Sequence, residues 1–387
     1  MIRQGHIDQA EAILVIWFAI GAKAVLNLPA AVTAHALTAG WMVVLGGGLL
    51  SLAAFLPGVL LMRRFPGLPY ARAGDEAGGL VPGKIAGVVT AAFLILLSSL
   101  TLRQSAEAFV TTLLPTTPVV VIILVFALTI GYSAYAGIEA LGRLVVFFVP
   151  WVVAILGLVL LGEVGMVDLR HLFPLWGRGP TAVAADMATS TSLYSEMLLL
   201  PILYPYLRRR RQAVRVGVWA ILLSTALLSV VQVVIVGAFD VSNTDRLVFP
   251  LISLARFISF GRLFSRVEAL VILVWIFAAA IQATALLWAV ATNLAECLRL
   301  PDHRPLITPL AAVIAAAATV PAGMREVAAI DFEYVHRWGA IVAFGLPLAL
   351  WFLAMVRGKR GPGASDQADE SGASAQTGEG GAGKEAR

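Results

Sequence analysis

Long apolar stretches recur along the whole chain, and they constrain its fold more than any other feature. Each holds about 20 residues with few charges, which is enough for a helix to cross the roughly 30 Å hydrocarbon core of a bilayer. The sequence therefore predicts an all-α integral membrane protein with ten transmembrane helices. The expected spans are residues 11–33, 40–62, 85–112, 118–136, 142–162, 181–206, 213–238, 266–297, 305–322 and 334–356.

Composition agrees with a membrane protein. Hydrophobic residues make up 59% of the 387 residues and charged residues 13%, about half the ~25% that is typical of soluble domains. The net charge of +5 comes from basic residues beside the spans, so it does not indicate a nucleic-acid partner. A single cysteine, Cys297, excludes an intrachain disulfide.

The spans predict one transmembrane domain over residues 1–357. Residues 246–264 are amphipathic and too interrupted to cross, so we expect an interfacial or re-entrant helix there. Residues 358–387 contain Gly, Ala, Ser and charged residues with no large apolar side chain, which predicts a disordered tail because such a segment cannot bury a core.

Basic residues gather in alternate loops and set the predicted orientation. Lys and Arg follow the second, fourth, sixth, eighth and tenth spans, including the run Arg208 to Arg211, whereas loops 34–39 and 113–117 have none. The positive-inside rule then places both termini and the tail in the cytoplasm. The arginine run could instead bind anionic lipid or a partner, but its role in topology accounts for it without further function.

The first span contains "IGAKAVLNLP" (Ile20 to Pro29), which is not a regular lipid-facing helix. Gly21 weakens the helix, and Pro29 removes a backbone hydrogen bond. Lys23 would cost about 2.5 to 3.5 kcal/mol near the bilayer centre on insertion scales. Irregular backbone survives in a bilayer only inside protein or beside a cavity, so we expect a break near Gly21–Ala24 that faces inward.

The sixth span contains a second irregular stretch, "DMATSTSLYSEMLLLP" (Asp186 to Pro201). Four successive hydroxyl residues, Thr189 to Ser192, compete with the helix for backbone hydrogen bonds. Breaks five spans apart are typical of a five-plus-five inverted repeat, here about 11–162 and 181–356, in which helices 1 and 6 are discontinuous and bind ligand at the midplane. The alternative is that these small residues only allow close helix crossings.

Polar residues in other spans extend the predicted pocket. Arg103 and Glu107 are four residues apart and can pair on one helix face, either as a structural ion pair or, with Glu196, as coupling groups. The amide of Gln282 must bond to another helix or to a ligand. The residues that we predict to line the pocket are Gly21, Ala22, Lys23, Ala24, Ser98, Thr101, Ser190, Thr191, Ser192, Gln282 and Thr284.

The chain lacks the sequence signatures of an enzyme. Its five histidines have no metal-ligand spacing, and neither a nucleophile elbow, a P-loop nor a dinucleotide-binding glycine pattern is present. We therefore expect neither catalysis, a metal nor a cofactor.

Several motifs in order resemble a known family. These are "RRFPGLPYA", "LRQSAEAFVTTLLPTTP", "YAGIEALGR" and "FPLISLARFISFGRLFSRVEALVILVWIF". They are similar to the B subunit of bacterial spore germinant receptors, ten-span relatives of amino acid permeases in the amino acid/polyamine/organocation superfamily. The resemblance covers residues 5–355.

The resemblance implies a ligand-sensing subunit in the spore inner membrane. It implies that a small germinant, an amino acid, binds in the pocket that transporter relatives use for substrate. The implied partners are a membrane-embedded A subunit and a lipoprotein C subunit, and occupancy triggers ion release through the complex. The alternative is a proton- or sodium-coupled secondary amino acid transporter with the same pocket.

The first span departs from the family pattern. Relatives have a small "GxG" pair where this chain reads "GAK", so Lys23 replaces the second small residue. Two hypotheses follow. The ammonium of Lys23 either pairs with the ligand carboxylate or stands where a coupling cation would sit.

Overall fold

The computed structural model describes residues 5–244, 246–257 and 267–361. Over these ranges the chain is helical, and its single β-bridge joins Ile7 to Leu207. The N-terminal part of the tail, residues 358–361, follows the last helix, and the rest of the predicted disordered tail lies outside the described residues.

Within the described ranges, seven continuous helical runs are long and apolar enough to cross a membrane. These runs contain α2 to α4 (Leu28–Ala36, Gly40–Ala54 and Leu56–Arg64), α6 (Leu80–Thr112), α7 (Val119–Ala136), α8 (Ile138–Gly162), α11 (Ala213–Thr244), α13 (Val267–Cys297) and α15 to α17 (Met324–Ile330, Arg337–Ala340 and Leu346–Val356). The shorter α14 (Arg304–Thr319) is the ninth span.

The first and sixth spans are broken, as the sequence predicts. The first is α1 (Gln9–Gly21) followed by α2, and the sixth is α9 (Pro180–Thr189) followed by α10 (Leu199–Leu203). These two broken spans and the short α14 together explain why a count by helix length gives seven rather than ten among the described residues. The predicted all-α ten-span class with discontinuous helices 1 and 6 is confirmed.

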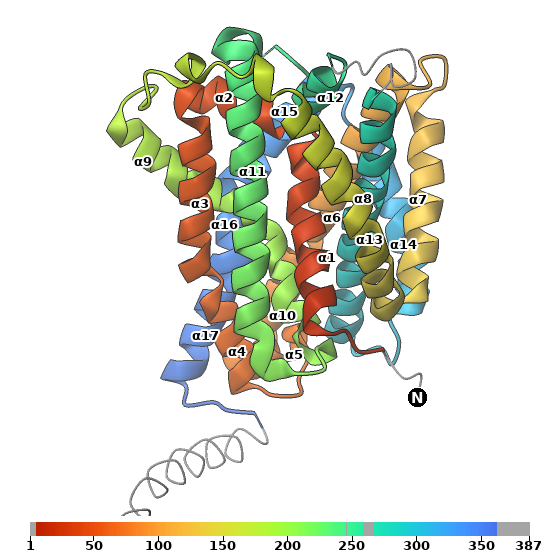
Figure 1. Cartoon of the computed structure of the whole chain (residues 1–387). Helices are drawn as coiled ribbons and strands as arrows, with labels where there is room; N and C mark the ends of the chain where they lie inside the picture. Colours follow the sequence, from red (N-terminus) through yellow and green to blue (C-terminus); the bar gives the residue numbers. More distant parts are fainter. Residues whose placement is uncertain (1–4, 245, 258–266, 362–387) are drawn as a thin grey trace, which may run out of the picture.

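The two halves of the chain run in opposite directions through the bundle. Span one starts at the end that carries the N-terminus, whereas α9 lies near the opposite end and leads down to α10 (Figure 1). Short helices repeat the inversion: α5 (Tyr70–Gly78) follows span two at the N-terminal end, and α12 (Pro250–Ala255) follows span seven at the other end (Figure 1). Of the predicted amphipathic segment 246–264, residues 258–264 lie outside the described ranges.

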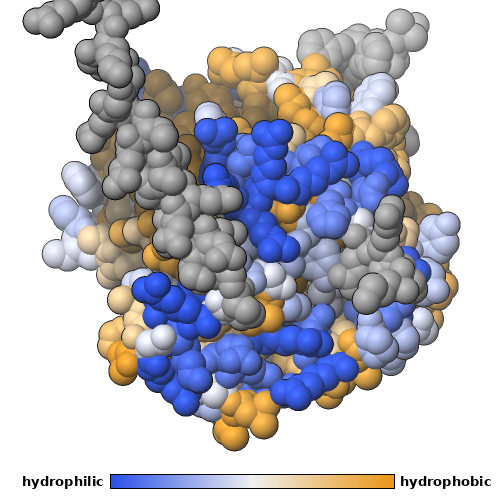
Figure 2. Space-filling view, turned by 90° about the horizontal axis from the view of Figure 1, so that it is seen from below, coloured by the Kyte–Doolittle hydropathy of each residue, from blue (hydrophilic) through white to orange (hydrophobic). Residues whose placement is uncertain are grey.

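The bundle presents apolar side chains outward and polar groups at its ends. α13 lies in the middle, with 72% of its apolar window buried, whereas only 22% of that of α8 is buried. Outward side chains such as Leu128, Phe147 and Trp151 are exposed and apolar, which suits contact with lipid tails. The end near the N-terminus shows hydrophilic residues across its face and apolar residues at its rim (Figure 2).

Span ten differs from its predicted bounds. It begins at Met324 rather than at residue 334, and two π-helical stretches, Asp331–His336 and Ile341–Gly345, interrupt it. Charged residues in its first turns lower the local hydropathy, so the sequence places them in a loop. In the structure they are helical and belong to the span.

Candidate functional site

The break in span one places Lys23 inside the bundle. α1 ends at Gly21, a single 3-10 turn covers Ala22–Ala24, and α2 begins at Leu28 with Pro29 in its first turn. Proline suits the first turn of a helix, where its missing N–H would be unpaired in any case. The side chain of Lys23 is 16% exposed.

The break in span six is a long 3-10 segment, Ser190–Leu198, in which Tyr194 leaves helical geometry with φ −104° and ψ 19°. Thr191 Oγ1 donates to the Ala188 carbonyl at 2.7 Å, and Ser192 Oγ donates to the Thr189 carbonyl at 2.6 Å. These are the local side-chain bonds that compete with regular helix, as the hydroxyl run predicts.

One ammonium group joins the two breaks. Lys23 Nζ donates to Glu196 Oε2 at 2.7 Å and to the Leu193 carbonyl at 2.9 Å. The unwound backbone of span six frees that carbonyl, and the lysine satisfies it. Glu196 is fully buried, and Gln282 Nε2 from α13 donates to its other oxygen at 3.4 Å.

Each member of this ion pair needs the other in order to stay buried. A buried carboxylate without a counter-charge is costly, and breaking a buried pair on one side costs about 3–5 kcal/mol. Lys23 and Glu196 therefore depend on each other, and any ligand that draws the ammonium away must replace its interaction with Glu196.

A small cavity of about 40 Å³ lies beside the pair. Such a volume holds one or two waters and is too small for an organic ligand. Five spans (one, three, six, eight and ten) line it with both polar and apolar residues. These are Lys23, Leu26, Asn27, Leu28, Leu97, Leu100, Thr101, Gln104, Ser192, Leu193, Glu196, Gln282, Asp331, Val335 and His336.

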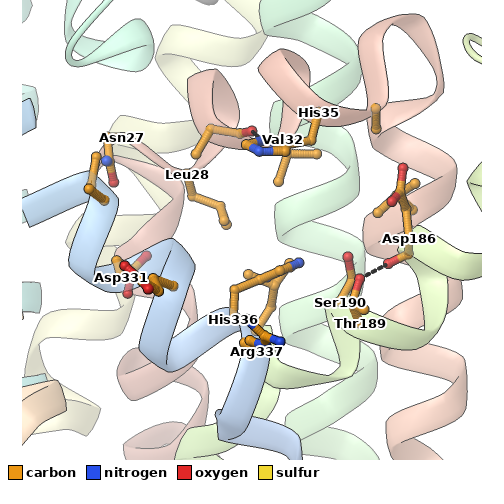
Figure 3. A pocket seen from close by; sticks show the side chains of 17 residues that line it. Asn27, Leu28, Val32, His35, Asp186, Thr189, Ser190, Asp331, His336 and Arg337 are labelled. Atoms are coloured by element: carbon orange, nitrogen blue, oxygen red, sulfur yellow. Dashed lines mark hydrogen bonds between the residues drawn. The ribbon is translucent and has the colours of Figure 1, made fainter.

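A larger vestibule of about 660 Å³ adjoins the small cavity and shares Asn27, Leu28, Leu193, Asp331 and His336 with it. Figure 3 shows that its walls come from α2, from the start of span ten and from the Ser190 end of α9. α2 and α9 lie toward the end of the bundle opposite the N-terminus, so the vestibule leads from that end to the Lys23 pair (Figure 1).

The structure brings about half of the predicted pocket residues together. Lys23, Thr101, Ser192 and Gln282 line the small cavity, and Ser190 lines the vestibule. Glu196, which was predicted as a coupling or ion-pair group, lines the small cavity as well. These residues come from four different spans.

Other predicted residues lie elsewhere. Gly21 and Ala22 line a separate cavity of about 20 Å³ beside Trp17 and Trp275. Ala24, Ser98, Thr191 and Thr284 are buried, but they are not among the side chains that line the small cavity or the vestibule. Helix geometry explains Ser98: α6 presents Leu97, Leu100, Thr101 and Gln104 to the cavity, and these positions share one face.

The predicted pair between Arg103 and Glu107 is present. Arg103 Nη2 donates to Glu107 Oε1 at 2.6 Å, and Arg103 Nη1 donates to the Ala318 carbonyl of α14 at 3.4 Å. The pair thus links α6 to α14, and neither side chain lines the small cavity.

Sequence reasoning missed the acidic and imidazole groups of span ten. Asp331 and His336 line both cavities, and His336 Nδ1 lies 3.3 Å from Ser192 Oγ. The sequence signal for these residues was a cluster of charged residues directly before an apolar span. Hydropathy alone assigns such a cluster to a loop. No cluster of three or more metal-ligating side chains occurs among the described residues.

Comparison with known families decides the class of this chain. A family profile described as "Spore germination protein" matches residues 7–325. The chain belongs to this family of spore germination proteins. Spore germination protein YndE of Bacillus subtilis is 26% identical over 70% of this chain and 75% of its own length. Spore germination protein A2 of the same organism is 25% identical over 65% of this chain and 69% of its own.

Solved structures confirm the fold. MhsT in complex with L-phenylalanine superposes with a TM-score of 0.71 at 14% identity, covering 91% of this chain and 89% of MhsT. Mhp1, a nucleobase-cation-symport-1 family transporter, gives a TM-score of 0.61 at 12% identity over 91% and 92% of the two chains. Both have the five-plus-five inverted repeat, so the family member described here has the architecture of a transporter.

Proposed function

We propose that this chain is the germinant-sensing membrane subunit of a spore germination receptor. It binds a small amino acid near the middle of the membrane, and binding triggers germination. The membrane is the spore inner membrane, with both termini in the cytoplasm. The Lys23–Glu196 pair, which joins both helix breaks at the base of the vestibule, is the observation that supports this proposal most.

The polar groups around the pair match the two charged ends of an amino acid. An ammonium group has three N–H donors, and Lys23 uses two of them on Glu196 and Leu193. The third is left for the ligand carboxylate. Asp331 lines the same cavity, and Gln282 Oε1 has no hydrogen-bond partner among the described residues. A carboxylate oxygen of Asp331 and the amide oxygen of Gln282 can therefore both accept from the ligand ammonium.

The vestibule suits the rest of the ligand. Its lining is largely apolar, with Leu28, Val32 and Leu193 among its residues. A ligand whose charged ends meet Lys23 and Asp331 would extend its side chain into this space (Figure 3). A small or medium apolar amino acid fits this arrangement.

Binding must enlarge the small cavity, and this gives a physical basis for a signal. About 40 Å³ cannot hold an amino acid, so the ligand selects a conformation in which spans one, six and ten stand further apart. A shift from mostly inactive to mostly active needs about 5.5 kcal/mol of differential binding, which several subunits can share. No chemical step is required.

The proposed partners follow from the family. A membrane-embedded A subunit and a lipoprotein C subunit would assemble with this chain, and the assembled complex would release ions. The kinship with several spore germination proteins of Bacillus subtilis supports this assignment.

Reconstitution tests the proposal. The purified chain is placed in lipid vesicles, and amino acids, sugars and nucleosides are screened for binding while flux is measured in parallel. We expect saturable binding of an amino acid without accumulation. Uphill accumulation driven by a proton or sodium gradient would instead support a secondary transporter, and absence of binding by the chain and by its complex with the partner subunits would refute a ligand site.

A further inference from the structure

A second polar cavity lies at the N-terminal end of the bundle, away from the Lys23 site. Its volume is about 130 Å³, which is room for several waters or one small anion. The turn between α7 and α8 and the loop between α13 and α14 form it, together with the rings of Tyr206 and Trp288. Nothing in the proposed function requires this cavity.

Two helices begin at this cavity. Gly137, with φ 91°, precedes α8, no side chain caps that helix, and Ile138, Glu139 and Ala140 line the cavity. The first N–H groups of a helix have no partner within the helix and carry partial positive charge. α14 also begins in this lining, at Arg304, but its first N–H groups are not available: the Arg304 N–H donates to Asp302 Oδ1, Pro305 has no N–H, and the Leu306 N–H donates to the His303 carbonyl.

His303 is an independent sign of a ligand. Only 7% of this residue is exposed, and neither ring nitrogen has a hydrogen-bond partner among the described residues. Asp302 Oδ1 lies 3.5 Å from Nδ1 without hydrogen-bond geometry. Burial lowers the pKa of His303, so the neutral ring offers one N–H donor. A buried polar group without a partner needs an explanation, and a bound ligand supplies one.

The charged side chains that line the cavity cancel in net charge. The partial positive charge at the start of α8 therefore favours an anionic ligand. Glu139 Oε1 accepts from Arg143 Nη1 at 2.7 Å, and Asp302 Oδ1 accepts from the Arg304 backbone N–H at 3.2 Å. The guanidinium of Arg304 lies 5.0 Å from the Tyr135 ring centroid. Two carboxylates thus balance two guanidinium groups, while the uncapped start of α8 adds partial positive charge.

We propose that this cavity binds a phosphate-type oxyanion through the free N–H groups of α8, the His303 ring and the Arg143 and Arg304 side chains. The bound phosphate group can belong either to a free phosphate ion or to the headgroup of an anionic lipid. Donors that converge from several directions suit a tetrahedral anion with several acceptor oxygens.

Selective labelling of histidine rings tests the site. The full chain is studied by NMR in phosphatidylcholine nanodiscs, and the His303 signal is assigned with His303→Gln. We expect inorganic phosphate to shift this signal saturably, whereas chloride at matched ionic strength does not. A second sample in phosphatidylglycerol nanodiscs without phosphate tests the lipid source. A shift in either sample supports the site and identifies the source.

Paired variants test the assigned donors. Glu139→Gln with Arg143→Gln removes the guanidinium without changing net charge, and we expect phosphate or lipid binding to weaken about tenfold or more. Asp186→Asn with Arg178→Gln removes a similar ion pair near the other end and should leave binding unchanged. No saturable shift in either sample, an equal shift with chloride, or full affinity in the Glu139/Arg143 variant would overturn the proposal.

Discussion

Lys23 holds two broken helices together through one ammonium group. Its bonds to Glu196 and to the Leu193 carbonyl span 173 and 170 residues of sequence, respectively. Each acceptor lies within the 3-10 segment of span six, and without Lys23 the Glu196 carboxylate would be buried without a counter-charge. The residue therefore has a structural role whether or not a ligand is bound.

Lys23→Met tests this structural role. The substitution leaves Glu196 buried without a counter-charge, so we expect a loss of about 3–5 kcal/mol of stability in chemical unfolding. Lys23→Met combined with Glu196→Gln removes the buried charge and should restore most of that loss. A single variant as stable as the parent would show that the ion pair is not formed.

Asp331→Asn tests ligand recognition. If Asp331 accepts from the ligand ammonium, the Kd of a bound amino acid should rise about tenfold, since a hydrogen bond to a charged group is lost. The corresponding acid without an amino group should bind the parent and the variant equally. Glu333→Gln is the matched control, because Glu333 lines the vestibule and not the small cavity. An equal effect of both variants would place the ammonium elsewhere.

At the scale of single residues, the sequence predicts site residues where a polar side chain interrupts an apolar span, because burying such a group is costly. Lys23, Glu196 and Gln282 are polar groups in apolar spans, and the structure brings them to one cavity. The facing direction of Ser98 and Thr284 could not be predicted, because it depends on the rotation of α6 and α13 against their neighbours. Asp331 was missed because its helix continues beyond the apolar stretch.

Among the elements, α3 packs against the 3-10 segment of span six, which carries Glu196. Gly46, Gly47 and Gly48 lie along α3, and a Cβ added at Gly47 would come within 2.8 Å of the Ser190 backbone. Close backbone approach through small residues is a common way for helices to pack in membranes. This contact lies beside Ser190, where the 3-10 segment of span six begins.

Gly47→Ala tests this packing. Alanine favours helix over glycine by about 1 kcal/mol, so an uncrowded site would gain stability. Gly157→Ala in α8 is the matched control, because nothing lies within 4 Å of its added Cβ. We expect Gly47→Ala to be less stable than Gly157→Ala by about 1–3 kcal/mol in unfolding measurements. Equal stability of the two variants would contradict the close contact.

The breaks were predictable at the scale of elements, whereas the π-helical stretches were not. Glycine, proline and a run of hydroxyl residues interrupt helices by local chemistry, so the sequence carries that information directly. The π-helical stretches of span ten have no comparable local signal in the sequence. They lie against the 3-10 segment of span six. Gly339, in α16 between the two stretches, has its Cβ position 3.3 Å from Ser192 Cβ.

For the whole molecule, inversion of the two halves puts the short helices α5 and α12 at opposite ends (Figure 1). The vestibule lies toward the end that carries α12, and the His303 cavity lies at the end that carries α5. The molecule thus has two cavities that lie toward opposite ends of the bundle. Their sidedness depends on the orientation inferred from the positive loops.

Thiol labelling tests that orientation. Cys297 is the single cysteine and is buried, so Cys297→Ala gives a background without thiols. Glu76→Cys and Leu169→Cys then place exposed thiols at the two ends. In intact cells, an impermeant reagent should label Leu169→Cys within minutes and Glu76→Cys only after lysis. The reverse pattern would invert the topology.

The covalent attachment of the Lys23 ammonium has a consequence for energetics. A dissolved sodium ion can enter a protein from one compartment and leave into the other, and the drop in its electrochemical potential can then drive uphill work. An ammonium tethered to its own backbone returns to where it started after every cycle. A protein that joins its two helix breaks with its own side chain keeps these parts in register without drawing on a sodium gradient.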